Sequence, residues 1–158
     1  ERVEKARDVA VTRLPDPAQR PPLDALGDVD HIAVAVENLE ESLKFYQDTL
    51  GLECISIETI EEQGVRVAKL DAGNTHIELL EPLSPDTPVG KFLRQRGQGL
   101  HHICFQVTDI RGELEQLKAC QTRLINENPQ IGAGGAEIAF VHPKSTGGVL
   151  MELSQHDH

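Results

Sequence analysis

The feature that most constrains this fold is an internal repeat. The segments DHIAVAVENLEESL and HHICFQVTDIRGEL superpose without a gap at an offset of 71 residues, which takes His31 to His102 (102 − 31). Further along each copy, HIELLEP and LMELSQ superpose at an offset of 74 residues, which takes Glu78 to Glu152 (152 − 78). Self-similarity of this kind indicates a duplicated structural unit whose small difference in length falls in loops.

Each copy has the pattern of a strand, a helix and three further strands. In the first copy, HIAVAV is followed by Asn38 as a helix N-cap, by a helix over about residues 39–50, and by three strand-like runs. In the second copy, GLHHICFQV is followed by Asp109 as the cap and by a helix that reaches Cys120. The runs RLINENP, AEIAFVHP and GGVLMELSQ then supply three more strands. The pattern therefore predicts two tandem βαβββ modules.

The chain divides into an extension and one domain. Residues 1–27 hold four prolines between Pro15 and Pro22 and show little hydrophobic periodicity, which indicates an extension outside the main fold. Residues 28–158 are predicted to form a single domain. Within it, module one covers about 28–83, a connector covers 84–99, and module two covers about 100–155.

Composition argues against several kinds of partner. No run approaches the roughly 18 consecutive apolar residues that a membrane span needs. The net charge of −11 argues against nucleic acid, which proteins bind through clustered Lys and Arg. Three cysteines without a CxxC pair predict free thiols in a reducing compartment, the cytoplasm or, in a eukaryote, the mitochondrial matrix. Cys104, within a predicted strand, is expected to be a buried and inert thiol.

Strand alternation places a histidine and a carboxylate of each copy on the same side of the sheet. If Ile32 faces the helix, His31 faces the opposite side, and the same reasoning applies to Glu78, His102 and Glu152. Two imidazoles and two carboxylates suit a divalent metal such as Co, Ni, Zn, Mn or Fe, with positions left open for a substrate oxygen. We therefore expect an α+β fold in which two tandem βαβββ modules form a concave eight-stranded mixed sheet around a metal site.

Several segments resemble the methylmalonyl-CoA epimerases of the vicinal oxygen chelate (glyoxalase/bleomycin resistance/dioxygenase) superfamily. They are DHIAVAV, FYQDTLG, EQGVRVAKL, NTHIELLEP, GLHHICFQV and IGAGGAEIAFVHPKSTGGVLMEL, which extend over residues 28–155, and HPKSTGGVLMEL is the most specific. The resemblance implies that His31, Glu78, His102 and Glu152 hold a divalent metal, with Co²⁺ favoured over Ni²⁺, Mn²⁺ or Zn²⁺. It also implies a homodimer that epimerises (R)- and (S)-methylmalonyl-CoA, a CoA thioester, by metal-assisted 1,1-proton transfer through an enolate.

Inverting a carbon by 1,1-proton transfer needs two acid–base groups, one on each side of that carbon. By resemblance, Glu152 is the first base. Some epimerases of this family have a glutamate three residues after the glycine of EQGV, where this chain has Val67. Lys69 and His76 are therefore the candidates for the second base.

The segment before the last strand is the predicted substrate-binding loop. His142, Lys144 and Ser145 lie there, and the resemblance favours contact with the substrate over an ordinary turn. His156 and His158, at the end of the chain, are expected to belong to a frayed tail without a function.

Three other functions remain open at this point. A glyoxalase I-like lyase acting on a glutathione hemithioacetal would use the same four ligands, although the HPKSTGGVLMEL ending favours an epimerase. An Fe(II) ring-cleaving oxygenase would need only His31, His102 and Glu152. A metal-free small-molecule-binding protein of the same fold would need none of the four.

Overall fold

The structure is a computed structural model that describes residues 26–156. Apart from Leu26 and Gly27, which begin the first strand, the predicted extension lies outside the described residues. The strands are β1 (Leu26–Ala35), β2 (Glu53–Ile60), β3 (Val65–Asp71), β4 (His76–Pro82), β5 (Gly99–Val107), β6 (Gln130–Ile131), β7 (Glu137–Val141) and β8 (Met151–Gln155). The α-helices are α2 (Leu39–Leu43), α3 (Pro88–Arg96) and α4 (Ile110–Ala119).

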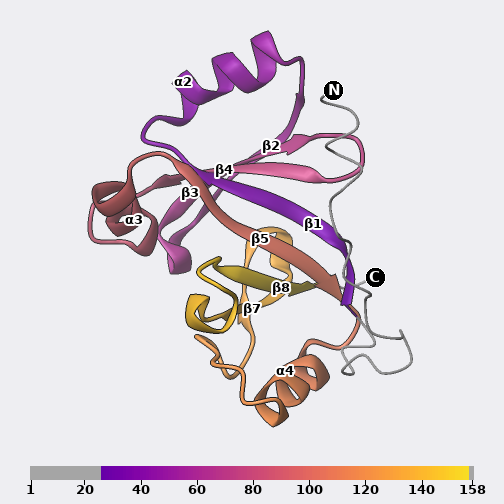
Figure 1. The fold of residues 1–158 in the computed structure, drawn as a ribbon. Coiled ribbons are helices and arrows are strands. Elements are labelled where there is room, and N and C mark those ends of the chain that lie inside the picture. The colour runs from indigo at the N-terminus through magenta and orange to yellow at the C-terminus, as the bar shows by residue number, and fades with distance from the viewer. Residues whose placement is uncertain (1–25, 157–158) are drawn as a thin grey trace, which may run out of the picture.

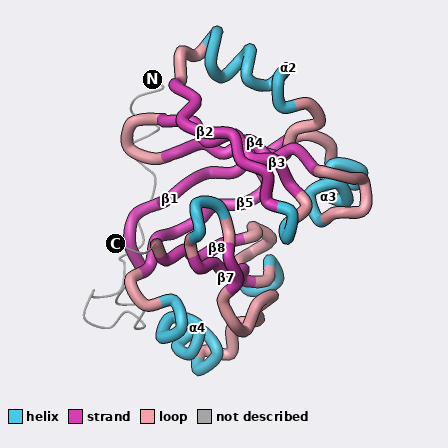
Figure 2. The backbone as a smooth tube through the Cα atoms, turned by 180° about the vertical axis from the view of Figure 1, so that it is seen from behind, coloured by secondary structure: helices cyan, strands magenta, loops and turns pink. Residues whose placement is uncertain are grey.

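The described strands form one eight-stranded sheet in the order β2-β3-β4-β1-β5-β8-β7-β6. In each half, the first strand pairs in parallel with the last, and the remaining neighbours are antiparallel. The antiparallel pair β1 and β5 joins the two halves, as Figures 1 and 2 show. This topology confirms the predicted mixed sheet of two tandem βαβββ modules.

Two of the helices cover the outer side of the curled sheet, one in each half (Figure 1). Leu39 of α2 packs against Leu70 and Leu79 of the first half. Ile110 of α4 packs against Leu153 of the second half. Since these apolar side chains occupy the outer side, the side chains that alternate with them point into the concave side.

The third helix, α3, covers part of the concave side. Its Val89 belongs to a buried cluster with Ala33 and Ala35 of β1, and Phe92 packs against that cluster. The helix therefore closes the concave side over the C-terminal half of β1. The open part of the concavity begins at the middle of β1, where His31 is located.

The two predicted helix N-caps are confirmed. Asn38 accepts a hydrogen bond from the backbone of Glu41, and Asp109 accepts one from the backbone of Gly112. The helix predicted over residues 39–50 is α-helical only over Leu39–Leu43, which is α2. It continues as a π-helix over Lys44–Thr49.

The predicted strand RLINENP is wrong. In its place the structure has a single bridge between Leu124 and Val141, followed by the short strand β6. The side chain of Asn126 accepts the backbone N–H of Phe140 at 2.9 Å. A side chain thus takes the backbone donor that a continuous strand ladder would have used, which explains why the pairing stops.

The ladder between β1 and β5 contains extra residues on both strands. On β1 the pairing passes from Val29 to His31 while β5 advances by one residue only, from Phe105 to Cys104, so Asp30 is the extra residue. On β5 the pairing passes from His102 to Leu100, so His101 is the extra residue there. Each is a β-bulge, which breaks strict alternation and re-aims side chains locally.

Candidate metal centre

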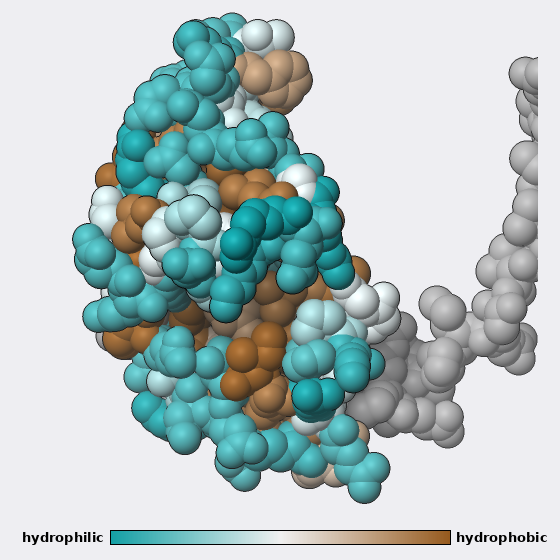
Figure 3. Space-filling view, turned by 90° about the vertical axis from the view of Figure 1, so that its left-hand side faces the viewer, coloured by the Kyte–Doolittle hydropathy of each residue, from teal (hydrophilic) through white to brown (hydrophobic). Residues whose placement is uncertain are grey.

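The concave side of the sheet encloses a cavity of about 680 Å³ that both halves line. Figure 3 shows apolar side chains gathered in a recess between polar ones on the side of the molecule that faces left in Figure 1. The four predicted ligands all line this cavity and are all buried: His31, Glu78, His102 and Glu152. The structure therefore brings together, from β1, β4, β5 and β8, the set that the repeat singled out.

Three of these side chains converge on one point. The Nε2 atoms of His31 and His102 lie 3.1 Å apart. Oε1 of Glu152 lies 3.0 Å from Nε2 of His31 and 3.2 Å from Nε2 of His102. Two imidazole nitrogens and a carboxylate oxygen at such distances can occupy adjacent positions around one small cation.

Glu78 borders this cluster on another side of His31. Its Oε2 lies 3.2 Å from Nδ1 of His31, the ring nitrogen that faces away from His102. The parallel pairing of β1 with β4 places Glu78 beside Ala33 in the ladder. Glu78 is therefore adjacent to the cluster of three, and a rotation of its side chain would be needed for it to join as a fourth ligand.

The residues fit a divalent cation. Oε1 of Glu152 is buried and receives no hydrogen bond from any described residue, although two imidazole nitrogens lie beside it. A buried carboxylate oxygen without a donor is costly unless a positive charge neutralises it. A cation between the two Nε2 atoms and Glu152 would satisfy all three groups at once.

The acid–base properties of the site follow from burial and from charge pairing. Burial alone would lower the pKa of His31, but the hydrogen bond to Asp30 and the nearby carboxylates of Glu152 and Glu78 raise this pKa to about 10. Burial would raise the pKa of Glu152, but the close approach of His102 and His31 lowers it to about 2. Burial raises the pKa of Glu78. Without a cation, the cluster thus holds an imidazolium beside an ionised carboxylate.

The proposed second bases lie in different surroundings. Lys69 lines the cavity and stands directly across the β3–β4 ladder from Glu78. His76 is not among the described residues that line the cavity, and its Nδ1 lies 3.3 Å from the backbone oxygen of Asp30. The cavity therefore favours Lys69 over His76 for contact with a substrate.

The predicted substrate-binding residues form a turn away from the cavity wall. Nδ1 of His142 accepts the backbone N–H of Lys144 at 3.0 Å, and Oγ of Ser145 accepts the backbone N–H of Arg123 at 2.9 Å. None of His142, Lys144 and Ser145 is among the described residues that line the cavity.

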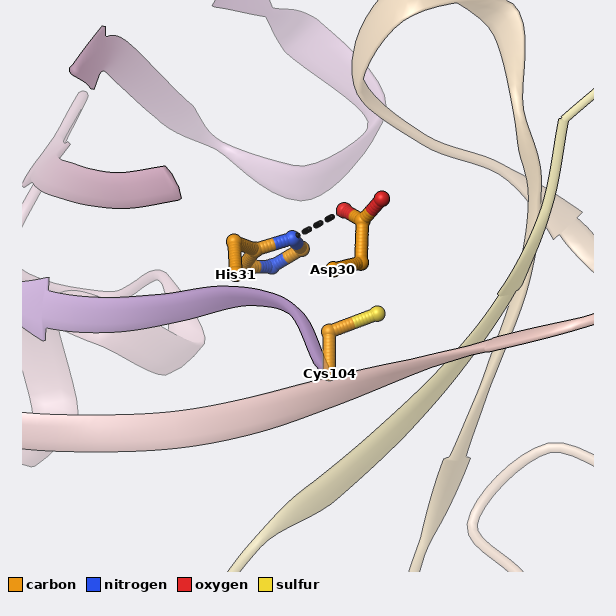
Figure 4. A group of neighbouring side chains, drawn as sticks. All are labelled: Asp30, His31 and Cys104. Atoms are coloured by element: carbon orange, nitrogen blue, oxygen red, sulfur yellow. Dashed lines mark hydrogen bonds and ion pairs between the residues drawn. The ribbon is translucent and has the colours of Figure 1, made fainter. Parts of the chain in front are cut away.

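Sequence reasoning missed three residues that line the cavity: Asp30, His101 and His156. Asp30 is 7% exposed, and its Oδ2 accepts a hydrogen bond from Nδ1 of His31 at 2.6 Å (Figure 4). His101 lines the cavity, and its Nδ1 lies 2.8 Å from Nδ1 of His102. Strict alternation from His31 and His102 would place both on the outer side, so their adjacency to these two histidines is the only signal that the sequence offers.

His156 corrects the expectation of a frayed tail. It lines the cavity, and its Nε2 lies 3.1 Å from Oδ1 of Asp30 and 3.2 Å from Oγ of Ser154. The continuation of β8 to Gln155 carries His156 back into the concave side. His158, which was expected to share the tail, lies outside the described residues.

Cys104 is buried, as predicted, and stands beside Asp30 and His31 (Figure 4). These three side chains come close enough together to hold an ion. However, burial raises the pKa of the Cys104 thiol, which keeps the sulfur protonated, whereas metals bind the thiolate. The cluster of His31, His102 and Glu152 is therefore the better candidate centre.

The Glyoxalase/Bleomycin resistance protein/Dioxygenase superfamily model matches residues 30–140. The chain belongs to this superfamily, whose fold of paired βαβββ modules is the one described above. Within it, mouse mitochondrial methylmalonyl-CoA epimerase is 41% identical over 85% of this chain and 76% of its own length. This similarity confirms the resemblance seen in the sequence.

A solved structure of an epimerase is also similar to this chain. A Streptomyces coelicolor methylmalonyl-CoA epimerase variant in complex with 2-nitronate-propionyl-CoA has a TM-score of 0.79 and 38% identity, over 83% of this chain and 95% of its own. The lactoylglutathione lyase of Haemophilus influenzae is more distant, with 29% identity over 70% of this chain and 81% of its own length. Within residues 26–156, no helix has the length and hydrophobicity of a membrane span.

The raised pKa of His31 predicts that metal and protons compete for this site. Coordination needs a neutral imidazole, whereas His31 is protonated at neutral pH in the metal-free protein. Metal binding should therefore release about one proton, and metal affinity should rise about tenfold per pH unit between pH 6 and 8. Calorimetry in two buffers of different ionisation enthalpy measures the proton count. Affinity that levels off above about pH 6.5, the ordinary value for histidine, would contradict the assigned role of His31.

Proposed function

We propose that this protein is a metal-dependent methylmalonyl-CoA epimerase. The observation that carries the proposal is the convergence of His31, His102 and Glu152 in a cavity, in a chain that is 41% identical to mouse mitochondrial methylmalonyl-CoA epimerase. The metal ligands are these three residues and Glu78, after rotation of its side chain. We propose Co²⁺ as the metal, with Ni²⁺, Mn²⁺ or Zn²⁺ as the alternatives that the same donor set accepts.

The cavity suits the malonyl end of a CoA thioester. Its volume of about 680 Å³ leaves room for a small acyl group, and Val67, Leu80 and Phe140 give it apolar walls. When bound, a divalent cation supplies the charge that stabilises the negative charge developing on the thioester oxygen. The apolar walls exclude water from the carbon that loses its proton, which strengthens every electrostatic interaction nearby.

Glu152 is the proposed first base. Its carboxylate is ionised at neutral pH, since the two histidines beside it lower its pKa to about 2. An ionised carboxylate beside the bound acyl group can accept the α-proton, and Glu152 faces the cavity from β8. The residue thus combines the roles of ligand and proton acceptor in the proposal.

Lys69 is the proposed second acid–base group, in preference to His76. It lines the wall formed by β3, in the module that does not carry Glu152. A proton returned from that wall reaches the carbon from a side other than that of Glu152, which inversion requires. Lys69 lies two residues from Val67 on β3 and so on the same side of the sheet, which supports this substitution for the missing glutamate.

The remaining parts of the proposal concern the outside of the molecule. His142, Lys144 and Ser145 are proposed contacts for the part of CoA that extends beyond the cavity. A homodimer is supported by the edge strand β2, where Ile55 and Ile57 are 49% and 50% exposed, since a second copy would cover this apolar surface. The proposed location is the cytoplasm, or the mitochondrial matrix in a eukaryote.

The other functions are less well supported. A lyase of the glyoxalase type has similar ligands, but the lyase relatives are more distant than the epimerases. A metal-free binding protein has no need for the unpaired buried carboxylate oxygen of Glu152. A ring-cleaving oxygenase needs only His31, His102 and Glu152 as ligands, and so does not account for a fourth buried ionisable residue, Glu78, beside them.

The proposed function predicts hydrogen exchange at one carbon of one substrate. The Co²⁺-loaded protein in D₂O should interconvert the two epimers of methylmalonyl-CoA and place deuterium at the α-carbon, because each proton comes from a group that exchanges with solvent. Mass spectrometry and chiral analysis measure both results. The glutathione hemithioacetal of methylglyoxal is the comparison substrate. Its conversion, with methylmalonyl-CoA left unlabelled, would replace the epimerase by the lyase.

The assigned base predicts unequal effects of two matched substitutions. Glu152→Gln keeps the size and one oxygen donor but removes the proton acceptor, so turnover should fall at least about a hundredfold. Glu78→Gln removes the same charge from the neighbouring carboxylate and should retain far more activity at saturating metal. Kinetics at confirmed metal occupancy make the comparison. Equal losses would mean that Glu152 is not the specific base.

Loss of the second acid–base group should separate exchange from inversion. In Lys69→Met, Glu152 can still remove and return a proton on its own side, so one epimer should exchange in D₂O while inversion falls about a hundredfold. Glu58→Gln is the control, because Glu58 is another ionisable residue of the same cavity wall. Inversion that survives in Lys69→Met and is lost in Glu58→Gln would assign the role to Glu58.

A further inference from the structure

Each of the two clustered histidines follows a residue that a β-bulge turns into the interior. Asp30 precedes His31 and His101 precedes His102, and each is the extra residue of a bulge in the β1–β5 ladder. Their separation of 71 residues (101 − 30) is the offset of the internal repeat, so the two bulges are equivalent positions of the two modules. The same backbone device thus occurs twice, once beside each histidine.

Asp30 holds His31 by the ring nitrogen that is not needed for a metal. Its Oδ2 accepts a hydrogen bond from Nδ1 of His31 at 2.6 Å (Figure 4). This leaves Nε2 of His31 facing Glu152. The other oxygen, Oδ1, lies 3.1 Å from Nε2 of Gln106 and 3.1 Å from Nε2 of His156. Both oxygens therefore have partners, so Asp30 is held in place and is not itself free to act as a ligand.

His101 makes the equivalent contact to His102. The two Nδ1 atoms lie 2.8 Å apart, while Nε2 of His102 faces Nε2 of His31. The ring of His101 packs edge-on against Phe92 of α3, with centroids 4.9 Å apart. The concave-side helix thus fixes the orientation of His101, and His101 in turn can fix that of His102.

We propose that Asp30 and His101 are positioning residues, each of which keeps the proton of its neighbouring histidine on Nδ1 and so leaves Nε2 free to bind a metal. The inference rests on the proposed metal centre and adds the source of its geometry. A hydrogen-bond acceptor behind a ligand histidine selects the tautomer, fixes the ring plane and makes the coordinating nitrogen more basic. The acceptor is an anion in module one and an imidazole in module two, so His31 should be the stronger donor of the pair.

The first test compares two Asp→Asn variants on β1. Asp30→Asn keeps the shape but replaces the anionic acceptor, and Co²⁺ affinity should fall about 10–100-fold. The visible absorption spectrum of the bound Co²⁺ should also change, because the donor strength of His31 changes. Asp28→Asn is the control, since Asp28 lies on the same strand and is exposed. Competition with a chelating dye measures affinity without reference to turnover.

The second test uses His101, where packing and hydrogen bonding can be separated. His101→Phe keeps an aromatic ring against Phe92 but has no acceptor, so metal affinity should fall. His101→Asn loses the ring but places an amide oxygen near the position of Nδ1, so affinity should be largely restored. A role in packing alone predicts the reverse order, and that order would overturn the proposal for His101.

The outcomes separate this inference from the function on which it rests. A wild-type protein that binds no divalent metal in the dye assay would remove the metal centre itself. A wild-type protein that binds Co²⁺, with Asp30→Asn equal to Asp28→Asn in affinity and spectrum, would overturn the inference and leave the epimerase intact. If Asp30→Asn does not fold, as judged by circular dichroism, the order of the two His101 variants decides.

Discussion

The rest of the structure depends on the antiparallel pairing of β1 with β5. This ladder joins two modules that would otherwise each have an open sheet edge, and it places Ala33 directly opposite His102. Because β1 and β5 are the central strands, each is flanked by the last strand of its own module, β4 or β8. Glu152 on β8 therefore reaches the same point as the two histidines, and Glu78 on β4 lies on the other side of the His31 ring.

Burial of the two histidines and two glutamates of the site is electrostatically unfavourable, and pairing of opposite charges offsets this effect. His31, Glu78, His102 and Glu152 are each at most 5% exposed. Isolated charges in such surroundings would be strongly unfavourable, and a pair is tolerated only when opposite charges and hydrogen bonds compensate. The shifts of pKa in opposite directions at His31 and Glu152 express that compensation. In the proposed enzyme, a divalent cation takes over the role of the proton on His31.

The cavity relates this centre to the proposed chemistry. Its base is charged, whereas Val67, Leu80 and Phe140 make parts of its wall apolar. An acyl group with two carbonyl oxygens matches such a cavity, since the oxygens can face the charged base and the alkyl group the walls. Ionisable residues remain on the wall of the first module, including Lys69 and Glu58. A second proton-transfer group is thus available there even though position 67 holds a valine.

The sequence by itself determined the modular fold and predicted the set of four ionisable side chains that gather in the cavity. Periodicity and the repeat identified most of the strands, the caps at Asn38 and Asp109, and four of the buried ionisable residues, because hydrophobic alternation and capping are local properties. The sequence could not identify Asp30 or His101 as interior residues. A bulge arises only when two strands pair in a particular register, and the register of β1 on β5 depends on packing across the whole sheet. It also could not bring His156 into the cavity or reduce RLINENP to a bridge, since both depend on contacts with residues distant in the chain.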